Sequence, residues 1–128
     1  MKAEISEIFS SIQGEGLYLG QKQIFVRFSS CNLNCDYCDE PKAKDNKAFS
    51  LLSVQEVVEK IKALQKKEKV EAVSLTGGEP LLQADFIEKI LPKIKELGLK
   101  AHLETNAVLF KEFKKIAKNV DVIAADIK

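Results

Sequence analysis

The 128-residue sequence has no tryptophan, and only 7% of its residues are aromatic. It also has almost no net charge, because 20 lysines and arginines balance 19 aspartates and glutamates. This balance gives no electrostatic reason to expect nucleic acid or an anionic membrane as a partner. No apolar run approaches the length of a membrane span, and the acidic Glu4 and Glu7 are atypical of a secretory signal. We therefore expect a cytoplasmic protein that binds neither nucleic acid nor membrane.

Apolar residues make up 45% of the chain, which is enough for the core of a single domain. Their spacing alternates between short apolar runs and helical stripes. The predicted strands are 23–28, 70–75, 100–105 and 120–126, and the predicted helices are 54–64, 84–97 and 109–118. Ser53 and Glu56 form a capping box, and Gly98 is a natural helix stop. Pro92 is a candidate kink.

Strands that alternate with helices predict an α/β fold with a parallel sheet and right-handed crossovers. Ligands of such sheets bind at the carboxyl ends of the strands. Polar or unusual residues follow each predicted strand, namely 31–38, 76–80, 104–106, Asp126 and Lys128. The sequence therefore predicts a functional site at this edge of the sheet.

The three cysteines form a C-x3-C-x2-C cluster made of Cys31, Cys35 and Cys38. An odd number of closely spaced cysteines is a poor disulfide framework and a good set of metal ligands. Structural zinc would need a fourth ligand such as Asp36, Asp39 or His102. A 4Fe–4S cluster on three thiolates would instead leave one iron open to a further ligand. The spacing favours iron–sulfur, with zinc as the alternative.

Two motifs resemble signatures of the radical S-adenosylmethionine (SAM) superfamily. They are the cysteine cluster with Tyr37 before its last cysteine, and Gly77-Gly78-Glu79-Pro80 after the 70–75 strand. The resemblance implies a partial (β/α)6 barrel with about four strands in this chain. It also implies that the open iron of the cluster binds SAM. One electron from the cluster would then cleave SAM to a 5′-deoxyadenosyl radical.

The resemblance also implies roles for individual residues. Cys31, Cys35 and Cys38 correspond to the cluster ligands. The SAM-binding positions correspond to Tyr37, Asp39, Gly77, Gly78, Glu79 and Asn106. Tyr37 would lie against the adenine, and Glu79 with its glycines would receive the amino group. Without SAM, Tyr37 would be an ordinary loop aromatic and Glu79 a charge at a helix N-terminus.

Further segments resemble the 7-carboxy-7-deazaguanine synthase family of radical SAM enzymes. They are SIQGEG (11–16), FVRF (25–28), LTGGEPLLQ (75–83), ETN (104–106) and DIK (126–128), together with the cysteine motif. This family converts 6-carboxy-5,6,7,8-tetrahydropterin to 7-carboxy-7-deazaguanine with loss of ammonia, in queuosine and deazapurine biosynthesis. The activity is that of a carbon–nitrogen lyase. The family continues past DIK, so we expect residues 1–128 to be the N-terminal portion of a radical SAM core domain.

The same resemblance implies the substrate-binding residues, which are Ile12, Gln13, Gly14, Arg27, Thr76 and Glu104. Residues 12–14 would contact the pterin through the backbone. Arg27 is the only arginine among 19 lysines, and its planar fork suits the substrate carboxylate. As alternatives, Arg27 is simply an exposed strand residue, and Glu104 and Asn106 cap the turn that follows their strand.

Two positions depart from the family pattern. Glu40 stands where a threonine usually follows the cysteine motif, and Ala107 stands where glycine usually follows ETN. The family uses a magnesium ion near the cluster loop, and the Glu40 carboxylate is the candidate ligand here. The resemblance also implies an electron donor such as flavodoxin, and a homodimer at full length.

Two other functions remain open from the sequence. A glycyl-radical activase shares the C-x3-C-x2-C motif but acts on a protein partner. A metal-binding or iron–sulfur-binding fragment without turnover would leave the apolar strand at 120–127 as an uncovered sheet edge, which favours association.

Overall fold

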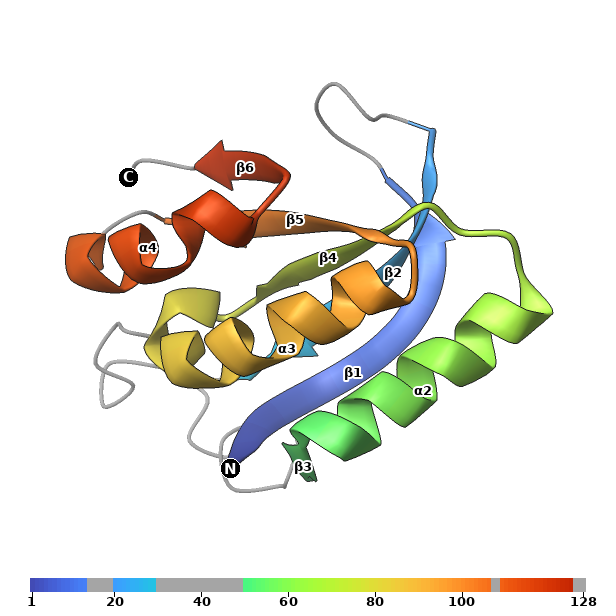
Figure 1. The fold of residues 1–128 in the computed structure, drawn as a ribbon, viewed down its shortest axis with the longest axis horizontal. Coiled ribbons are helices and arrows are strands. Elements are labelled where there is room, and N and C mark those ends of the chain that lie inside the picture. The colour runs from blue at the N-terminus through green and yellow to red at the C-terminus, as the bar shows by residue number, and fades with distance from the viewer. Residues whose placement is uncertain (14–19, 30–49, 107–108, 126–128) are drawn as a thin grey trace, which may run out of the picture.

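The computed structural model describes residues 1–13, 20–29, 50–106 and 109–125 (Figure 1). These residues form one six-stranded sheet in the order β3-β1-β2-β4-β5-β6. The strands are β1 Lys2–Ile12, β2 Lys22–Phe28, β3 Ser50–Ser53, β4 Ala72–Gly77, β5 Lys100–Thr105 and β6 Val122–Ala125. The helices are α2 Val54–Lys67, α3 Ala84–Glu96 and α4 Phe110–Ile116, with 3-10 turns η3 Pro80–Gln83 and η4 Ala117–Asn119.

The predicted α/β fold is confirmed in its parallel half. Strands β2, β4, β5 and β6 are the four predicted strands, and each pairs in parallel with the next. The three predicted helices are present as α2, α3 and α4. Helix α3 continues through Pro92 and is followed by Gly98 at φ 79°. No helix among the described residues is both long and apolar enough to cross a membrane.

Strands β1 and β3 were not predicted from the sequence. Both are antiparallel to their neighbours, so the sheet is mixed rather than purely parallel. The apolar residues of β1 after Ile5, which are Ile8, Phe9 and Ile12, do not alternate with polar ones, and the register shifts between Ile5 and Glu7. β3 has four residues and runs directly into the helix N-cap Ser53, too short to show a period.

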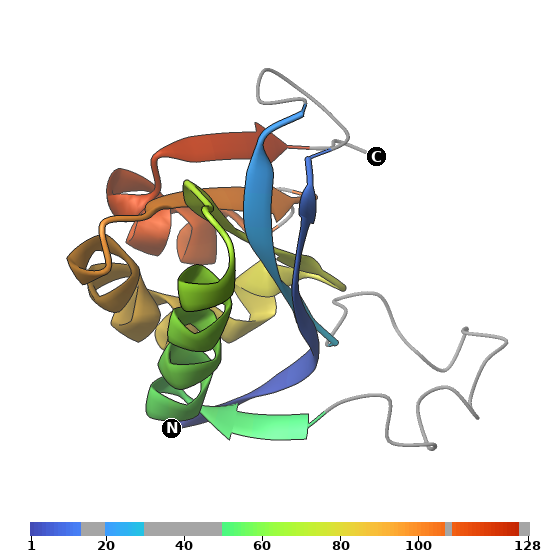
Figure 2. The same ribbon diagram turned by 90° about the vertical axis from the view of Figure 1, so that its right-hand side faces the viewer.

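The helices α2, α3 and α4 lie on one side of the sheet (Figure 2). Alternate strand residues point toward them and form the core, including Ile24, Val26, Phe28, Val73, Leu75, Ala101 and Leu103. The capping box at the start of α2 is confirmed, because Glu56 N donates to Ser53 Oγ and Ser53 N donates to Glu56 Oε1. The remaining strand residues point to a face that no described helix covers, which we call the open face.

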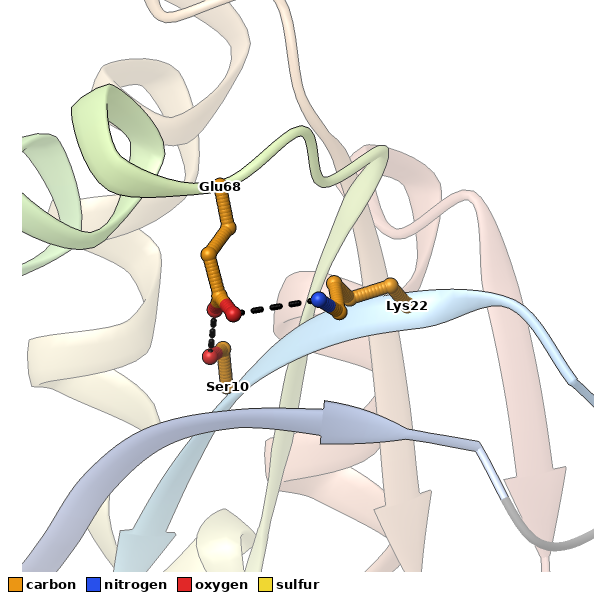
Figure 3. Close-up of polar contacts among 3 residues, drawn as sticks. All are labelled: Ser10, Lys22 and Glu68. Atoms are coloured by element: carbon orange, nitrogen blue, oxygen red, sulfur yellow. Dashed lines mark hydrogen bonds and ion pairs between the residues drawn. The ribbon is translucent and has the colours of Figure 1, made fainter.

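A polar contact joins β1, β2 and α2 at the end of the sheet where β2 begins (Figure 3). Ser10 Oγ donates to Glu68 Oε2, and Lys22 Nζ lies 3.0 Å from Glu68 Oε1. The hydrogen bond from Ser10, together with Lys22, lowers the pKa of the Glu68 carboxyl below its usual value. These three side chains attach the end of helix α2 to the β1–β2 pair.

Candidate functional site

Three of the predicted substrate-binding residues lie in one row across the open face, near the carboxyl ends of the parallel strands. Arg27 of β2 is in register with Thr76 of β4. Thr76 and Glu104 each follow the β4–β5 pair Leu75–Leu103 by one residue, so the row continues onto β5. Parallel strands place ligand sites at this edge. The structure therefore brings Arg27, Thr76 and Glu104 to one edge of one face.

Arg27 is exposed but not free of contacts. Its Nη1 lies 3.0 Å from Glu7 Oε1, and its guanidinium lies 5.4 Å from the centre of the Phe9 ring. Phe9 in turn stacks on Phe25 at 5.4 Å between ring centres. An exposed ion pair contributes little to stability, so this arrangement mainly orients the guanidinium. A fork held over an aromatic ring retains donors for a second carboxylate.

The Gly77–Gly78 turn packs directly against the end of β2. Gly77 has φ 112°, and a Cβ added there would lie 2.2 Å from the carbonyl oxygen of Phe28. Gly78 N donates to the same oxygen at 2.7 Å. Glycine is required at position 77 both by its backbone conformation and by this close approach. The turn is thereby fixed beside the strand that leads into the cysteine segment.

Glu79 is 1% exposed and receives three hydrogen bonds. Leu81 N and Thr105 Oγ1 donate to its Oε2 at 2.8 and 2.6 Å, and Asn106 N donates to its Oε1 at 2.8 Å. It is also the N-cap of η3, as the helix-charge alternative expected. No lysine or arginine of the described residues forms an ion pair with it. A buried carboxylate with only neutral donors is a favourable place for a cationic group.

Ile12 and Gln13 lie at the other end of the sheet. Ile12 pairs with Lys22 at the start of β2, five register positions from the Glu7–Arg27 pair. This separation is about 17 Å along the strand. Gln13 is buried, its Nε2 lies 3.3 Å from Gln23 Oε1, and its backbone N donates to Gln21 O. The structure therefore does not bring Ile12 and Gln13 together with the row on β2, β4 and β5.

His102, the candidate fourth zinc ligand, is a buried residue of β5. Its Nδ1 lies 3.3 Å from Gln23 Nε2, and burial lowers its pKa, although Asp121 opposes this shift. It is in register with Ser74, whose Oγ donates to Glu104 Oε2 at 3.5 Å. Ser74 and Gln23 were not predicted from the sequence as site residues. The signal was available, because both occupy the strand positions between the apolar core residues.

The remaining predicted site residues lie outside the described part of the chain. They are Cys31, Cys35, Cys38, Tyr37, Asp39, Glu40 and Gly14. The cluster and magnesium assignments therefore stay predictions.

Comparison with known proteins settles the family. The model of the radical SAM superfamily matches residues 25–128. The chain belongs to the radical SAM superfamily. Membership implies a 4Fe–4S cluster and SAM, and the environment of Glu79 fits the cationic amino group of SAM.

Curated relatives extend the match to the N-terminus. The 7-carboxy-7-deazaguanine synthase of Methanothermobacter thermautotrophicus is 47% identical to this chain over the chain's whole length. The match covers 50% of that protein. The synthase of Archaeoglobus fulgidus is 44% identical, also over the whole chain, which covers 56% of it. The chain thus spans about half the length of these relatives.

A solved structure supports the radical SAM fold. The crystal structure of QueE from Escherichia coli superposes with a TM-score of 0.66 over 84% of this chain and 54% of that one, at 22% identity. At this identity the likeness establishes the fold alone. It agrees with the four parallel strands β2, β4, β5 and β6 of the six-stranded sheet as part of a barrel.

Proposed function

We propose that this protein is a 7-carboxy-7-deazaguanine synthase. It would convert 6-carboxy-5,6,7,8-tetrahydropterin to 7-carboxy-7-deazaguanine with loss of ammonia, as a carbon–nitrogen lyase of queuosine and deazapurine biosynthesis. The observation that carries the proposal is a sequence identity of 44–47% to two synthases, in alignments that cover the whole of this chain. Residues 1–128 would be part of the radical SAM core domain.

Each cofactor has candidate residues. Cys31, Cys35 and Cys38 would hold the 4Fe–4S cluster, and SAM would supply a 5′-deoxyadenosyl radical when bound. The Glu79 carboxylate, beside Gly77 and Gly78, would receive the SAM amino group, with Asn106 adjacent to it. Tyr37 and Asp39 complete the SAM-binding set, and Glu40 is the candidate Mg²⁺ ligand.

Substrate recognition would centre on Arg27. Its guanidinium would bind the pterin carboxylate with the donors that Glu7 leaves available. Thr76 and Glu104 lie in the same row and would contact the ring system. Ile12, Gln13 and Gly14 would contribute backbone contacts. The described positions of Ile12 and Gln13 support a contact with a different part of the bound molecules from that of Arg27.

The cellular setting follows from the same proposal. The enzyme would be cytoplasmic and would receive electrons from a flavodoxin-like donor. It would form a homodimer at full length and would bind neither nucleic acid nor membrane.

Anaerobic reconstitution with iron and sulfide, followed by an assay of SAM cleavage with the carboxypterin, tests the function. We expect 5′-deoxyadenosine and 7-carboxy-7-deazaguanine to form together, and neither to form in a Cys35→Ala variant. SAM cleavage without the deazapurine would contradict the substrate. A protein-borne glycyl radical would establish the activase, which the curated relatives do not favour.

The fragment hypothesis is addressed by the same preparation. Ile123 of β6, the last strand in the order of the described sheet, is 39% exposed. A preparation that binds iron but never cleaves SAM, and that associates on size-exclusion chromatography, would favour this hypothesis over the synthase.

A further inference from the structure

Thr105 ends strand β5 between two predicted site residues, Glu104 and Asn106, and neither the motifs nor the spacing assign it a role. It is 5% exposed and shares its strand face with Leu103, whereas Glu104 points to the open face. Its hydroxyl donates to Glu79 Oε2 at 2.6 Å, which joins the end of β5 to the turn that follows β4. This is the shortest donor–acceptor distance at the Glu79 carboxylate.

We propose that Thr105 is a positioning residue for SAM. Its hydroxyl, together with the amide of Asn106, holds the Glu79 carboxylate in the orientation that receives the SAM amino group. The inference rests on the proposed role of Glu79 and extends it to a residue that acts through the Glu79 carboxylate.

The geometry explains why Leu81 alone is not sufficient. Leu81 N is two residues from Glu79 and fixes only Oε2, which leaves the carboxylate free to rotate about its last torsion. Asn106 N binds the other oxygen, Oε1, from the end of β5. Thr105 Oγ1 binds Oε2 from the same strand end. Donors on both oxygens, from two chain segments, define the plane of the carboxylate.

The same contact couples the two sides of the site. Thr105 lies between Glu104, which belongs to the row with Arg27 and Thr76, and Asn106, whose amide binds Glu79. A fixed Thr105 therefore fixes the backbone of both neighbours. The SAM side and the substrate side of the β5 terminus then form one rigid unit with the Gly77–Glu79 turn.

Isosteric substitutions separate the hydroxyl from the bulk of the side chain. Thr105→Val keeps the branched shape and removes the donor, and Thr105→Ser keeps the donor. In anaerobically reconstituted protein, measured by equilibrium binding of SAM, we expect Thr105→Val to raise the SAM dissociation constant about tenfold. Thr105→Ser should stay within about threefold of the original protein, because a hydrogen bond to the carboxylate is retained.

Ser53→Ala is the matched control for general destabilisation. It also removes a hydroxyl, at the cap of α2, where the hydroxyl binds Glu56 N and has no contact with Glu79. It should lower the unfolding temperature and leave the SAM dissociation constant unchanged. If Thr105→Val does not fold, Thr105→Ala removes the same donor without placing a methyl group against Glu79.

A second readout does not depend on SAM. In protein without iron or SAM, amide hydrogen exchange at Asn106 should be faster in Thr105→Val than in the original protein, and restored in Thr105→Ser. Unchanged SAM binding and unchanged exchange in Thr105→Val would overturn the proposal, as would a failure of Thr105→Ser to restore binding. Absence of SAM binding in the original protein, with the exchange pattern as expected, would contradict the proposed function. The orientation of the Glu79 carboxylate by Thr105 and Asn106 would then stand without a role in SAM binding.

Discussion

The two ends of the parallel strands hold their polar groups in different ways. At the carboxyl ends, Glu79 is buried and bound by neutral donors from η3 and β5. At the opposite end, Glu68 is bound by Ser10 and Lys22 at the surface. The loss of a hydrogen bond costs more free energy at a buried group than at the surface, because water replaces the lost partner of a surface group. The carboxyl end of the parallel strands therefore holds its carboxylate in a fixed orientation, as a binding site for a small cationic ligand requires.

The largest expected effect is at the turn that closes the carboxyl end. Gly77→Ala places a Cβ 2.2 Å from the Phe28 carbonyl oxygen at a φ of 112°, so strain and overlap add. We expect a loss of about 4 kcal/mol in the free energy of unfolding, measured by chemical denaturation.

Gly20→Ala is the control for that prediction. Gly20 also has a positive φ, 89°, but a Cβ there would meet no atom of the described residues within 4 Å. Gly20→Ala should lower the free energy of unfolding by about 1 kcal/mol, which is the contribution of the backbone conformation alone. Equal losses in the two variants would show that the close approach of Gly77 to β2 is unimportant.

The second comparison exchanges one carboxylate at each end for an amide. Glu79→Gln leaves buried donors without an anionic acceptor and should lower the free energy of unfolding by about 2 kcal/mol, measured by chemical denaturation. Glu68→Gln should have a much smaller effect, because both partners of Glu68 can turn to water. A larger effect at Glu68 than at Glu79 would reverse the proposed difference between the ends.

The third prediction separates binding from stability on the open face. Arg27→Lys removes the bidentate fork from an exposed position, so the free energy of unfolding should change by less than about 0.5 kcal/mol. Turnover measured at varied carboxypterin should show a KM raised about tenfold. Glu7→Gln, which keeps Arg27 intact, should leave KM at or below its original value. A rise in KM for Glu7→Gln alone would show that Glu7 is the substrate contact.

The smallest effect is the pH dependence of the surface end. The pKa of Glu68 is lowered in the folded protein by Ser10 and then by Lys22. A lowered folded pKa contributes stability that is complete above the unfolded pKa and is lost as the pH falls through the folded value. Denaturation midpoints measured from about pH 6 to about pH 3 should therefore fall less steeply in Glu68→Gln. Parallel slopes would contradict a role for this contact.

Local sequence patterns predicted much of the fold. The stripe that includes Val57, Val58 and Ile61 indicates α2, and Ser53 with Glu56 marks its start. The short apolar strands β2, β4, β5 and β6 follow from the same reasoning. β1 escaped prediction because pairing with β2 and β3, rather than its own alternation, defines it as a strand.

The candidate site was predicted in its location and not in its internal contacts. The general rule for parallel strands predicts from the sequence that Thr76, Glu79 and Glu104 lie at one edge of the sheet. The family resemblance grouped Ile12 and Gln13 with them as substrate-binding residues, whereas the antiparallel register of β1 places Ile12, and Gln13 after it, at the opposite end of the sheet. Register between distant segments is not encoded in any local pattern.

The sequence alone determined which segments are helices or parallel strands, where the turn glycines fall and at which sheet edge the chemistry lies, because these depend on neighbours a few residues apart. Tertiary structure decided that Thr105 reaches Glu79, that Gly77 touches Phe28 and that Arg27 meets Glu7. These contacts join residues 20 to 49 positions apart. Their distances depend on how the strands align once the common core is packed.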